Sequence, residues 1–300
     1  MTDIWELCRG HPGYPAALED LDAVDGQRSP ERLYGCGDRA LVTGLDPAGA
    51  VTIVGARRCT AYGRETATEL AGSLAAAGIV VVSGMAYGID SAAHRGALDA
   101  GGTTIAVLAC GPERAYPPSA RALYRRIAGG GGAIVSEAAP GYAPKKWDFP
   151  RRNRIMAALA RMTIVVEARQ ASGSRHTADH ALALNREVGA VPGPVRSPLS
   201  AGPHGLLDDG AVLVTGAQDV LDRMLGTGVA SARRVGPALE GDAASLLGVL
   251  ADGSLSLAGA GQAAGLDPSR AAIALARLEL LGYVRQDSGR YARTGLTPPG

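Results

Sequence analysis

From Val51 onward, short apolar runs alternate with segments of helical spacing, and this alternation limits the possible folds more than any other feature. Strands are expected at residues 51–54, 79–82, 103–108, 133–135, 163–166, 188–191 and 211–214. Helices are expected at residues 62–77, 119–128, 152–162, 174–186 and 218–224. Because the strands are apolar throughout and helices separate them, the pattern predicts a parallel sheet that is covered on both faces. The sequence therefore predicts an α/β fold over residues 51–225, with a Rossmann-like, doubly wound and mostly parallel sheet.

The segments on either side of this region have a different character. Prolines interrupt residues 1–50, so we expect an N-terminal lead-in that packs on the main domain. Residues 226–241 show little periodicity and are predicted to be a linker. Residues 242–294 predict three short helices and a β-hairpin, with Asp267 as an N-cap ahead of Pro268. This combination is typical of a small C-terminal winged-helix domain.

Composition and missing motifs exclude several classes of protein. The four cysteines are scattered without a CxxC pair, so neither a zinc site nor a disulfide framework is expected. No basic leader and no apolar stretch of about 18 residues is present, and we expect a cytoplasmic protein without a membrane span. The chain has no GxGxxG after the first strand, no GxxxxGK[ST] and no GxSxG. No cofactor is therefore expected.

Residues 145–154 form the densest positive run, in a chain whose net charge is only +1. Five of these ten residues are basic and one is acidic. Clustered cations are stabilised by an anion, and a nucleic-acid backbone is the commonest polyanion. Trp147 and Phe149 lie within the run and offer flat surfaces on which unpaired bases can stack. The run predicts a local nucleic-acid site, and a solvated turn is the alternative.

Small and polar residues follow several of the predicted strands. They include Gly55–Arg57, Ser83–Asp90, Gly111, and Glu167 with Ser172–Arg175. Glycines allow backbone N–H groups to approach an anion, and ligands of open α/β sheets bind beyond the carboxyl ends of the strands. Arg57 could clamp a phosphate in this position. The alternative is that each turn needs glycine for its geometry alone.

Four further polar residues receive structural interpretations. Asp90 is expected to hold its loop rather than to act as a base. His94 is expected to be either structural or in contact with phosphate. His176 and His180 lie four residues apart on a predicted helix, but no third metal ligand is indicated, so a capping or surface role is expected.

The ordered motifs resemble those of the DprA (Smf) family, the DNA-processing proteins of natural transformation. The motifs are Val54–Arg57, Ser83–Asp90 with Ala93–Gly96, Tyr116–Pro118, Phe149–Ile155, Val166–Ala168 with Ser172–Ser174, and Val191–Gly193. Tyr14-Pro15 and Leu33–Gly35 in the lead-in also fit, so the resemblance covers about residues 10–225. It implies a protein without a known catalytic reaction that binds single-stranded DNA in a positive pocket.

The resemblance further implies a recombination mediator that protects incoming single-stranded DNA and loads the RecA recombinase during natural transformation. It also implies a homodimer, for which we expect the apolar region around residues 206–220 to supply the surface. The strand-end turns, the basic run and the resemblance together give the candidate contacts to single-stranded DNA. These are Gly55, Arg57, Ser83, Gly84, Tyr87, Gly88, Arg121, Lys145, Lys146, Arg151, Arg152, Asn153, Arg154, Ser172, Gly173, Ser174 and Arg175.

The chain departs from the family pattern at a few positions. Ala56 replaces the usual Ser, which removes one hydroxyl. Tyr87 replaces an Arg and exchanges a charge for a ring that can stack or form a hydrogen bond. Arg175 replaces an apolar residue and can restore that charge. The chain is also expected to lack the helical N-terminal domain that is common in the family.

Two other functions compete with this interpretation. One is a nucleotide-binding or nucleotide-hydrolysing protein related to the phosphoribohydrolases, but His180 stands where that family has its catalytic Glu. The other is a transcription factor whose third winged-helix helix reads duplex DNA. Residues 269–281 are strongly apolar, with Arg270 and Arg277 as their basic side chains, which favours packing or protein contact.

Overall fold

The alternation of strands and helices predicted from Val51 onward is present in the computed structural model. It describes residues 3–230, 234–235, 237–251, 253–294 and 296–298. The chain divides into two compact units, Met1–Ala232 and Arg233–Gly300. The predicted linker, residues 226–241, extends across this division, and Arg234–Val235 within it forms strand β10.

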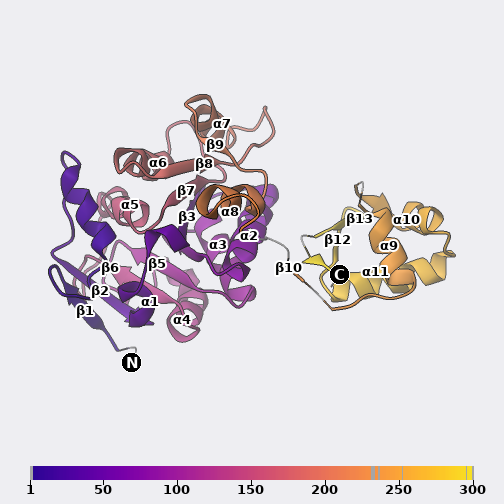
Figure 1. Cartoon of the computed structure of the whole chain (residues 1–300), viewed down its shortest axis with the longest axis horizontal. Helices are drawn as coiled ribbons and strands as arrows, with labels where there is room; N and C mark the ends of the chain where they lie inside the picture. The colour runs from indigo at the N-terminus through magenta and orange to yellow at the C-terminus, as the bar shows by residue number, and fades with distance from the viewer. Residues whose placement is uncertain (1–2, 231–233, 236, 252, 295, 299–300) are drawn as a thin grey trace. The chain divides into compact units, whose positions relative to one another are not determined.

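The first unit contains a mixed sheet with nine strands among its described residues (Figure 1). The strands are β1 (Trp5–Cys8), β2 (Arg32–Gly37), β3 (Ala50–Val54), β4 (Val80–Ser83), β5 (Thr104–Leu108), β6 (Ala133–Ser136), β7 (Met162–Val165), β8 (Glu187–Ala190) and β9 (Val212–Leu213). Their order across the sheet is β1-β2-β6-β5-β4-β3-β7-β8-β9. The strands from β6 to β9 in this order are parallel, which confirms the predicted doubly wound, mostly parallel sheet.

The chain reverses its direction of travel across the sheet at β3. Strands β4, β5 and β6 follow on one side of β3, whereas β7, β8 and β9 follow on the other. The loops that leave β3 and β7 therefore run to opposite faces of the sheet and leave a crevice at their carboxyl ends.

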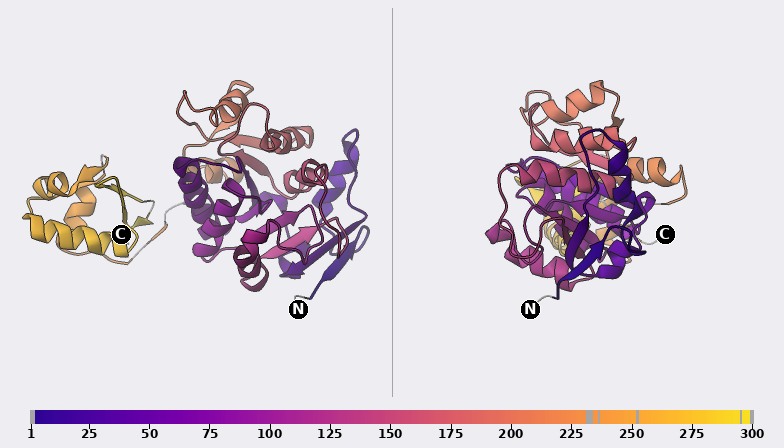
Figure 2. Two further views of the ribbon diagram at one scale, coloured as in Figure 1. Left: turned by 180° about the vertical axis from the view of Figure 1, so that it is seen from behind. Right: turned by 90° about the vertical axis from the view of Figure 1, so that its left-hand side faces the viewer.

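Helices cover both faces of the sheet (Figures 1 and 2). They are η1 (Ala16–Ala23), α1 (Arg39–Thr43), η2 (Pro47–Gly49), α2 (Ala61–Ala76), α3 (Ile89–Asp99), η3 (Pro118–Ala120), α4 (Arg121–Gly129), α5 (Asp148–Ala158), α6 (Gly173–Ala183), α7 (Ala201–Asp208) and α8 (Ala217–Leu225). Ala50 and Val54 of β3 join a core with α5 and α6, whereas Val51 and Ile53 join a core with α2 and α3. This is the alternation that places successive strand residues on opposite faces.

The lead-in contributes more to the sheet than the sequence predicts. Strand β2 pairs antiparallel with β6, and β1 pairs antiparallel with β2, so the lead-in forms one edge of the sheet (Figure 2, indigo). The indole of Trp5 donates to the carbonyl of Gly37 at 3.2 Å. Gly35 is required beneath that indole, because a Cβ there would overlap the ring of Trp5. The lead-in is therefore part of the main domain and does not merely pack on it.

The second unit contains the elements expected of its sequence. They are α9 (Asp242–Val249), β11 (Leu255–Ser256), α10 (Leu257–Ala264), α11 (Pro268–Leu280), β12 (Val284–Asp287) and β13 (Arg290–Arg293), with β10 paired to β14 (Leu296–Thr297). Asp267 caps α11 by accepting hydrogen bonds from the N–H groups of Ser269 and Arg270, each at 3.0 Å. The assignment of this unit as a winged-helix domain remains a prediction. No helix in the described parts of either unit has the length and apolarity to span a lipid bilayer.

Candidate nucleic-acid interface

A cavity of about 650 Å³ lies at the carboxyl ends of β3 and β7, where the path of the chain across the sheet reverses. We call it the strand-end cavity. Its lining comes from the end of β3 and the turn after it, the loops after β4 and β5, helix α5 with the segment before it, and the start of α6. The lining residues are Val54, Gly55, Ala56, Arg57, Ala86, Asp90, Tyr116, Pro144, Lys146, Phe149, Pro150, Arg152, Asn153, Met156, Ser172, Gly173, Ser174 and Thr177.

Glycine at two of the predicted positions has a geometric reason. A Cβ on Gly55 would come within 2.5 Å of Ile89 and 2.9 Å of the Glu167 carbonyl oxygen. Gly88 has a φ of 76°, and a Cβ there would overlap the carbonyl oxygen of Ala56. The turns after β3 and β4 thus touch one another through backbone atoms, which shapes the wall of the cavity.

The side chain of Glu167, two residues after the end of β7, binds the turn that follows β3. Its carboxylate accepts hydrogen bonds from the backbone N–H of Thr60 at 2.8 Å and from the Thr60 hydroxyl at 2.6 Å. It therefore fixes the start of α2 and, through it, the turn that carries Arg57.

Cationic and aromatic side chains line the same cavity. The guanidinium carbon of Arg57 lies 5.3 Å from the centroid of the Phe149 ring, in cation–π range. The ring of Tyr116 packs against Phe149 with a centroid separation of 5.3 Å. Lys146 adds a second exposed cation to the lining. Such a site can bind a phosphate and an unpaired base together.

Polar groups at the start of α6 are suited to an anion. The N–H groups of the first turn of α6 begin at Gly173, in the cavity wall. The hydroxyls of Ser172 and Thr177 are buried and lack a hydrogen-bond partner among the described residues. Asn153 donates through its amide to the Gly173 carbonyl at 3.1 Å and holds this helix end against α5. A bound phosphate could supply the acceptors that the two hydroxyls lack.

Arg152 has a supporting role that the sequence analysis did not expect. Only 5% of the residue is exposed, and its guanidinium donates to the carbonyls of Gly84, at 2.8 Å, and Val107. Helix α5 begins at Asp148, four residues earlier than predicted, and this start turns Arg152 toward the sheet. Burial lowers the pKa of Arg152 to about 10, and nearby Asp90 partly opposes that shift. The structure thus places this guanidinium in the floor of the cavity.

Asp90 and His94 are both buried near Arg152. Burial raises the pKa of Asp90, and the Arg152 charge and the backbone N–H of Ala86 partly oppose this. Asp90 accepts a hydrogen bond from that N–H at 3.3 Å, which fits the predicted role in holding the loop. His94 contacts the Thr104 hydroxyl at 2.7 Å and is fully buried. Burial lowers the pKa of His94 to about 3, so the ring is neutral and structural.

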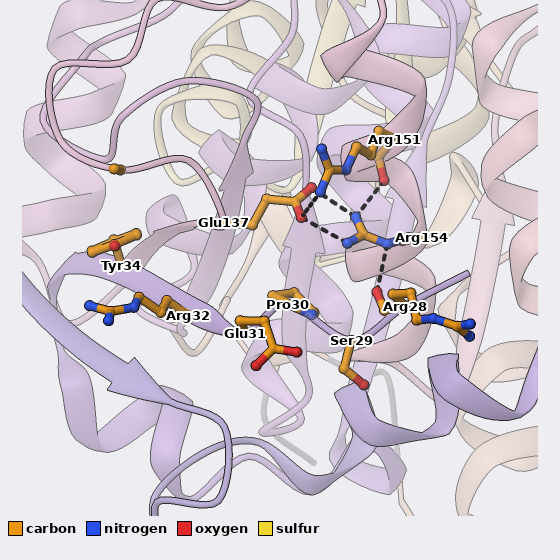
Figure 3. A pocket seen from close by; sticks show the side chains of 10 residues that line it. Arg28, Ser29, Pro30, Glu31, Arg32, Tyr34, Glu137, Arg151 and Arg154 are labelled. Atoms are coloured by element: carbon orange, nitrogen blue, oxygen red, sulfur yellow. Dashed lines mark hydrogen bonds and ion pairs between the residues drawn. The ribbon is translucent and has the colours of Figure 1, made fainter. Parts of the chain in front are cut away.

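Arg151 and Arg154, two of the predicted contacts in the basic run, lie outside the strand-end cavity. Arg154 donates to both carboxylate oxygens of Glu137, each at 2.8 Å, and only 6% of it is exposed. Arg151 donates to the same carboxylate at 3.2 Å. Figure 3 shows both guanidinium groups directed at Glu137. Their side chains leave α5 on a different side from Phe149 and Asn153, because residues three or four apart share a helix face.

The remaining predicted contacts are dispersed. Tyr87 is about half exposed, and its hydroxyl accepts a hydrogen bond from Ser119 at 3.0 Å. Arg175 pairs with Asp209 at 3.1 Å. The exposed Lys145 ammonium lies 5.5 Å from the Trp147 ring. Gly84, Ser83, Gly88 and Arg121 are also absent from the lining; the Ser83 hydroxyl is buried and donates to the Ile53 carbonyl.

Several residues of the cavity were not predicted as contacts. Thr177 follows Ser174 by three residues and so shares its helix face, which is a signal that the sequence offered. Tyr116 and Pro144 come from loops, and their positions could not be inferred from spacing. Within the described residues, no cluster of three or more His, Cys, Asp or Glu side chains could hold a metal ion.

Comparisons with known proteins agree with the fold. A family model described as DNA recombination-mediator protein A matches residues 5–225. A putative DNA processing protein DprA of Mycobacterium tuberculosis is 51% identical over 173 residues, which are 58% of this chain and 44% of that protein. The chain spans about half the length of the curated relatives that it matches.

Two solved structures are also similar. The X-ray structure of DNA processing protein A from Streptococcus pneumoniae has a TM-score of 0.66 and 37% identity, over 73% of this chain and 74% of that chain. DNA processing protein A from Helicobacter pylori, whose structure was described for its single-stranded DNA binding mode, has a TM-score of 0.65 and 30% identity. That match covers 75% of this chain and 98% of the other.

Proposed function

The chain belongs to the DNA recombination-mediator protein A family, and we propose that it binds single-stranded DNA in the strand-end cavity as a step in recombination. The observation that carries this proposal is the placement of Arg57 beside the Phe149 ring, in a cavity that Lys146 also lines. Cations hold the phosphates of a strand, while aromatic faces accept its unpaired bases. A duplex keeps its bases stacked and would present only its phosphates to the cavity.

The proposed contacts are independent of base sequence. The lining offers cations, a helix N-terminus and two unpaired hydroxyls, and all of these suit phosphate oxygens. The aromatic group accepts any base, since every base has a π-face. Binding should therefore weaken steeply with salt and vary little with base composition.

Fluorescence anisotropy with labelled oligo-dT and a matched duplex, each across a salt series, tests the proposal. The Arg57→Ala/Lys146→Ala variant should bind oligo-dT more weakly, with a salt slope smaller by about 1.4 for two lost phosphate contacts. The control is Arg39→Ala/Arg125→Ala, which removes the same charge from exposed positions. The backbone N–H of Asp38, next to Arg39, donates to the carbonyl of Gly132, just before β6. Arg39 therefore lies at the end of the strands opposite to the strand-end cavity.

Two outcomes would overturn the proposal. One is equal affinity of the parent chain for single-stranded and duplex DNA, and the other is unchanged binding by the cavity variant. Release of free base from a nucleoside monophosphate would favour the nucleotide-hydrolase alternative. His180, which stands where that family has its catalytic Glu, lies outside the lining of the cavity.

The family also suggests the later steps. We propose that the protein protects incoming single-stranded DNA, acts as a homodimer and loads RecA onto the strand during natural transformation. RecA nucleation on DNA covered by a single-strand binding protein, with and without this chain, tests the loading step. Analytical ultracentrifugation tests the dimer. RecA nucleation that is no faster with this chain would contradict the loading step. A monomer at all concentrations would contradict the homodimer.

A further inference from the structure

A second cavity, of about 460 Å³, lies where the lead-in meets helix α5 (Figure 3). We call it the lead-in cavity. Its lower rim in the figure is the segment from Arg28 to Arg32, which enters β2. Glu137, after β6, and Arg151 and Arg154, from α5, form the other side.

The lead-in cavity carries excess positive charge. Four arginines and two glutamates line it, in a chain whose net charge is +1. Arg154 and Glu137 neutralise each other in a buried pair at 2.8 Å. Arg151 makes one longer contact to the same carboxylate and is 64% exposed. Arg28 is exposed as well, and the hydrogen bond that its guanidinium donates goes to the backbone carbonyl of Gln27. Its charge also helps to lower the pKa of Asp22, a carboxylate that is paired with Arg9 at 2.6 Å. Arg28 and Arg151 thus remain available to an anion.

The two cavities flank the same helix. Phe149 and Asn153 of α5 line the strand-end cavity, whereas Arg151 and Arg154 line the lead-in cavity. A helix with its side chains is about 10–12 Å thick, so a flexible strand that leaves one cavity can reach the other. Trp147, at the start of α5, is 67% exposed. Its exposed ring offers a stacking surface for a base at the start of this helix.

We propose that the lead-in cavity is a second phosphate-binding subsite for the same DNA strand, which crosses the start of α5 after leaving the strand-end cavity. The proposal rests on the proposed function and extends it, because it assigns DNA contacts to Arg28 and Arg151 on the far side of α5. A short oligonucleotide occupies the strand-end cavity alone. A longer one gains the phosphate contacts of the second subsite.

The test compares the shortest oligo-dT that the parent chain binds with one several nucleotides longer. The Arg28→Ala/Arg151→Ala variant should bind the short oligonucleotide as the parent does. Its affinity for the longer one should fall on the order of tenfold, with a salt slope smaller by about 1.4. The Arg39→Ala/Arg125→Ala control should match the parent at both lengths. Thermal melting of each variant checks that the fold is intact.

The outcomes separate this inference from the proposed function. If the variant matches the parent on the longer strand, or loses affinity equally at both lengths, the second subsite is wrong and the strand-end cavity stands. If the parent chain binds no single-stranded DNA, the proposed function fails and the subsite fails with it.

Discussion

Replacing Arg152 should lower the stability of the folded protein rather than simply remove a DNA contact. Its guanidinium donates to the Gly84 and Val107 carbonyls and to the Asn153 side chain. Hydrogen bonds from a charged donor contribute about 1.5–3 kcal/mol each, so the three together contribute roughly 6 kcal/mol. Burial of the charge opposes this stabilisation, because the guanidinium loses its hydration. The lowering of the Arg152 pKa from 12.5 to about 10 corresponds to about 3 kcal/mol against the charged form.

The difference predicts that Arg152→Met lowers the free energy of unfolding by about 3 kcal/mol. For a domain of this size, the melting temperature should fall by roughly 6–12 °C. Differential scanning calorimetry measures the shift, and Arg151→Met is the matched control on the exposed neighbour. DNA binding is then measured well below the melting temperature, where Arg152→Met should lose less affinity than Arg57→Ala/Lys146→Ala. An unchanged melting temperature together with a large loss of DNA affinity would refute the supporting role and place this guanidinium on the DNA.

Three further predictions follow from local geometry. Gly88→Ala should lower the free energy of unfolding by about 2 kcal/mol or more, because φ is 76° and the new Cβ would overlap the Ala56 carbonyl; urea unfolding measures it. The neutral, buried His94 contributes stability that is complete above pH 6.5 and is lost as the pH falls toward its folded pKa of about 3. Urea unfolding at pH 6.5 and pH 5 should therefore differ by about 2 kcal/mol more in the parent than in His94→Gln. Asp267→Ala should cost the second unit about 1 kcal/mol, seen as faster amide hydrogen exchange in α11.

Each of these predictions has a contradicting result. Gly248→Ala, where a Cβ would meet nothing within 4 Å, is the control for Gly88→Ala, and equal destabilisation of both would contradict the strain argument. Identical pH dependence in the parent and His94→Gln would show that His94 does not titrate as argued. Unchanged amide exchange in α11 of Asp267→Ala would contradict the capping argument.

The sequence predicted the parallel part of the sheet because each of its strands is uniformly apolar and is separated from the next by a helix. It did not predict β1 and β2. Glu6 and Arg32 interrupt their apolar pattern, and three prolines lie between the two strands, which resembles an irregular segment. The register with β6 that makes them strands is a long-range contact, which local patterns do not encode.

The site was predictable in outline but not in the direction of its side chains. The basic run revealed the charge but not which arginines reach solvent. A helix that starts at Asp148 places Arg152 one turn ahead of buried Ile155 and Met156 and so turns it inward. That start depends on Tyr142 and the N–H of Lys145, which both donate to Asp148. The pairing of Arg154 with Glu137 likewise joins segments 17 residues apart in sequence.

The antiparallel edge formed by β1 and β2 matters for anyone who shortens this protein. A fragment that starts near residue 51 contains every helix and strand that the periodic pattern predicts in the main domain, yet it lacks the partner of β6. Its outermost strand would then present unpaired N–H and C=O groups along an apolar segment, and such an edge invites aggregation. It would also lose Leu18 and Leu33 from the core and Arg28 from the lead-in cavity. Expression plasmids for this domain should therefore retain the first fifty codons.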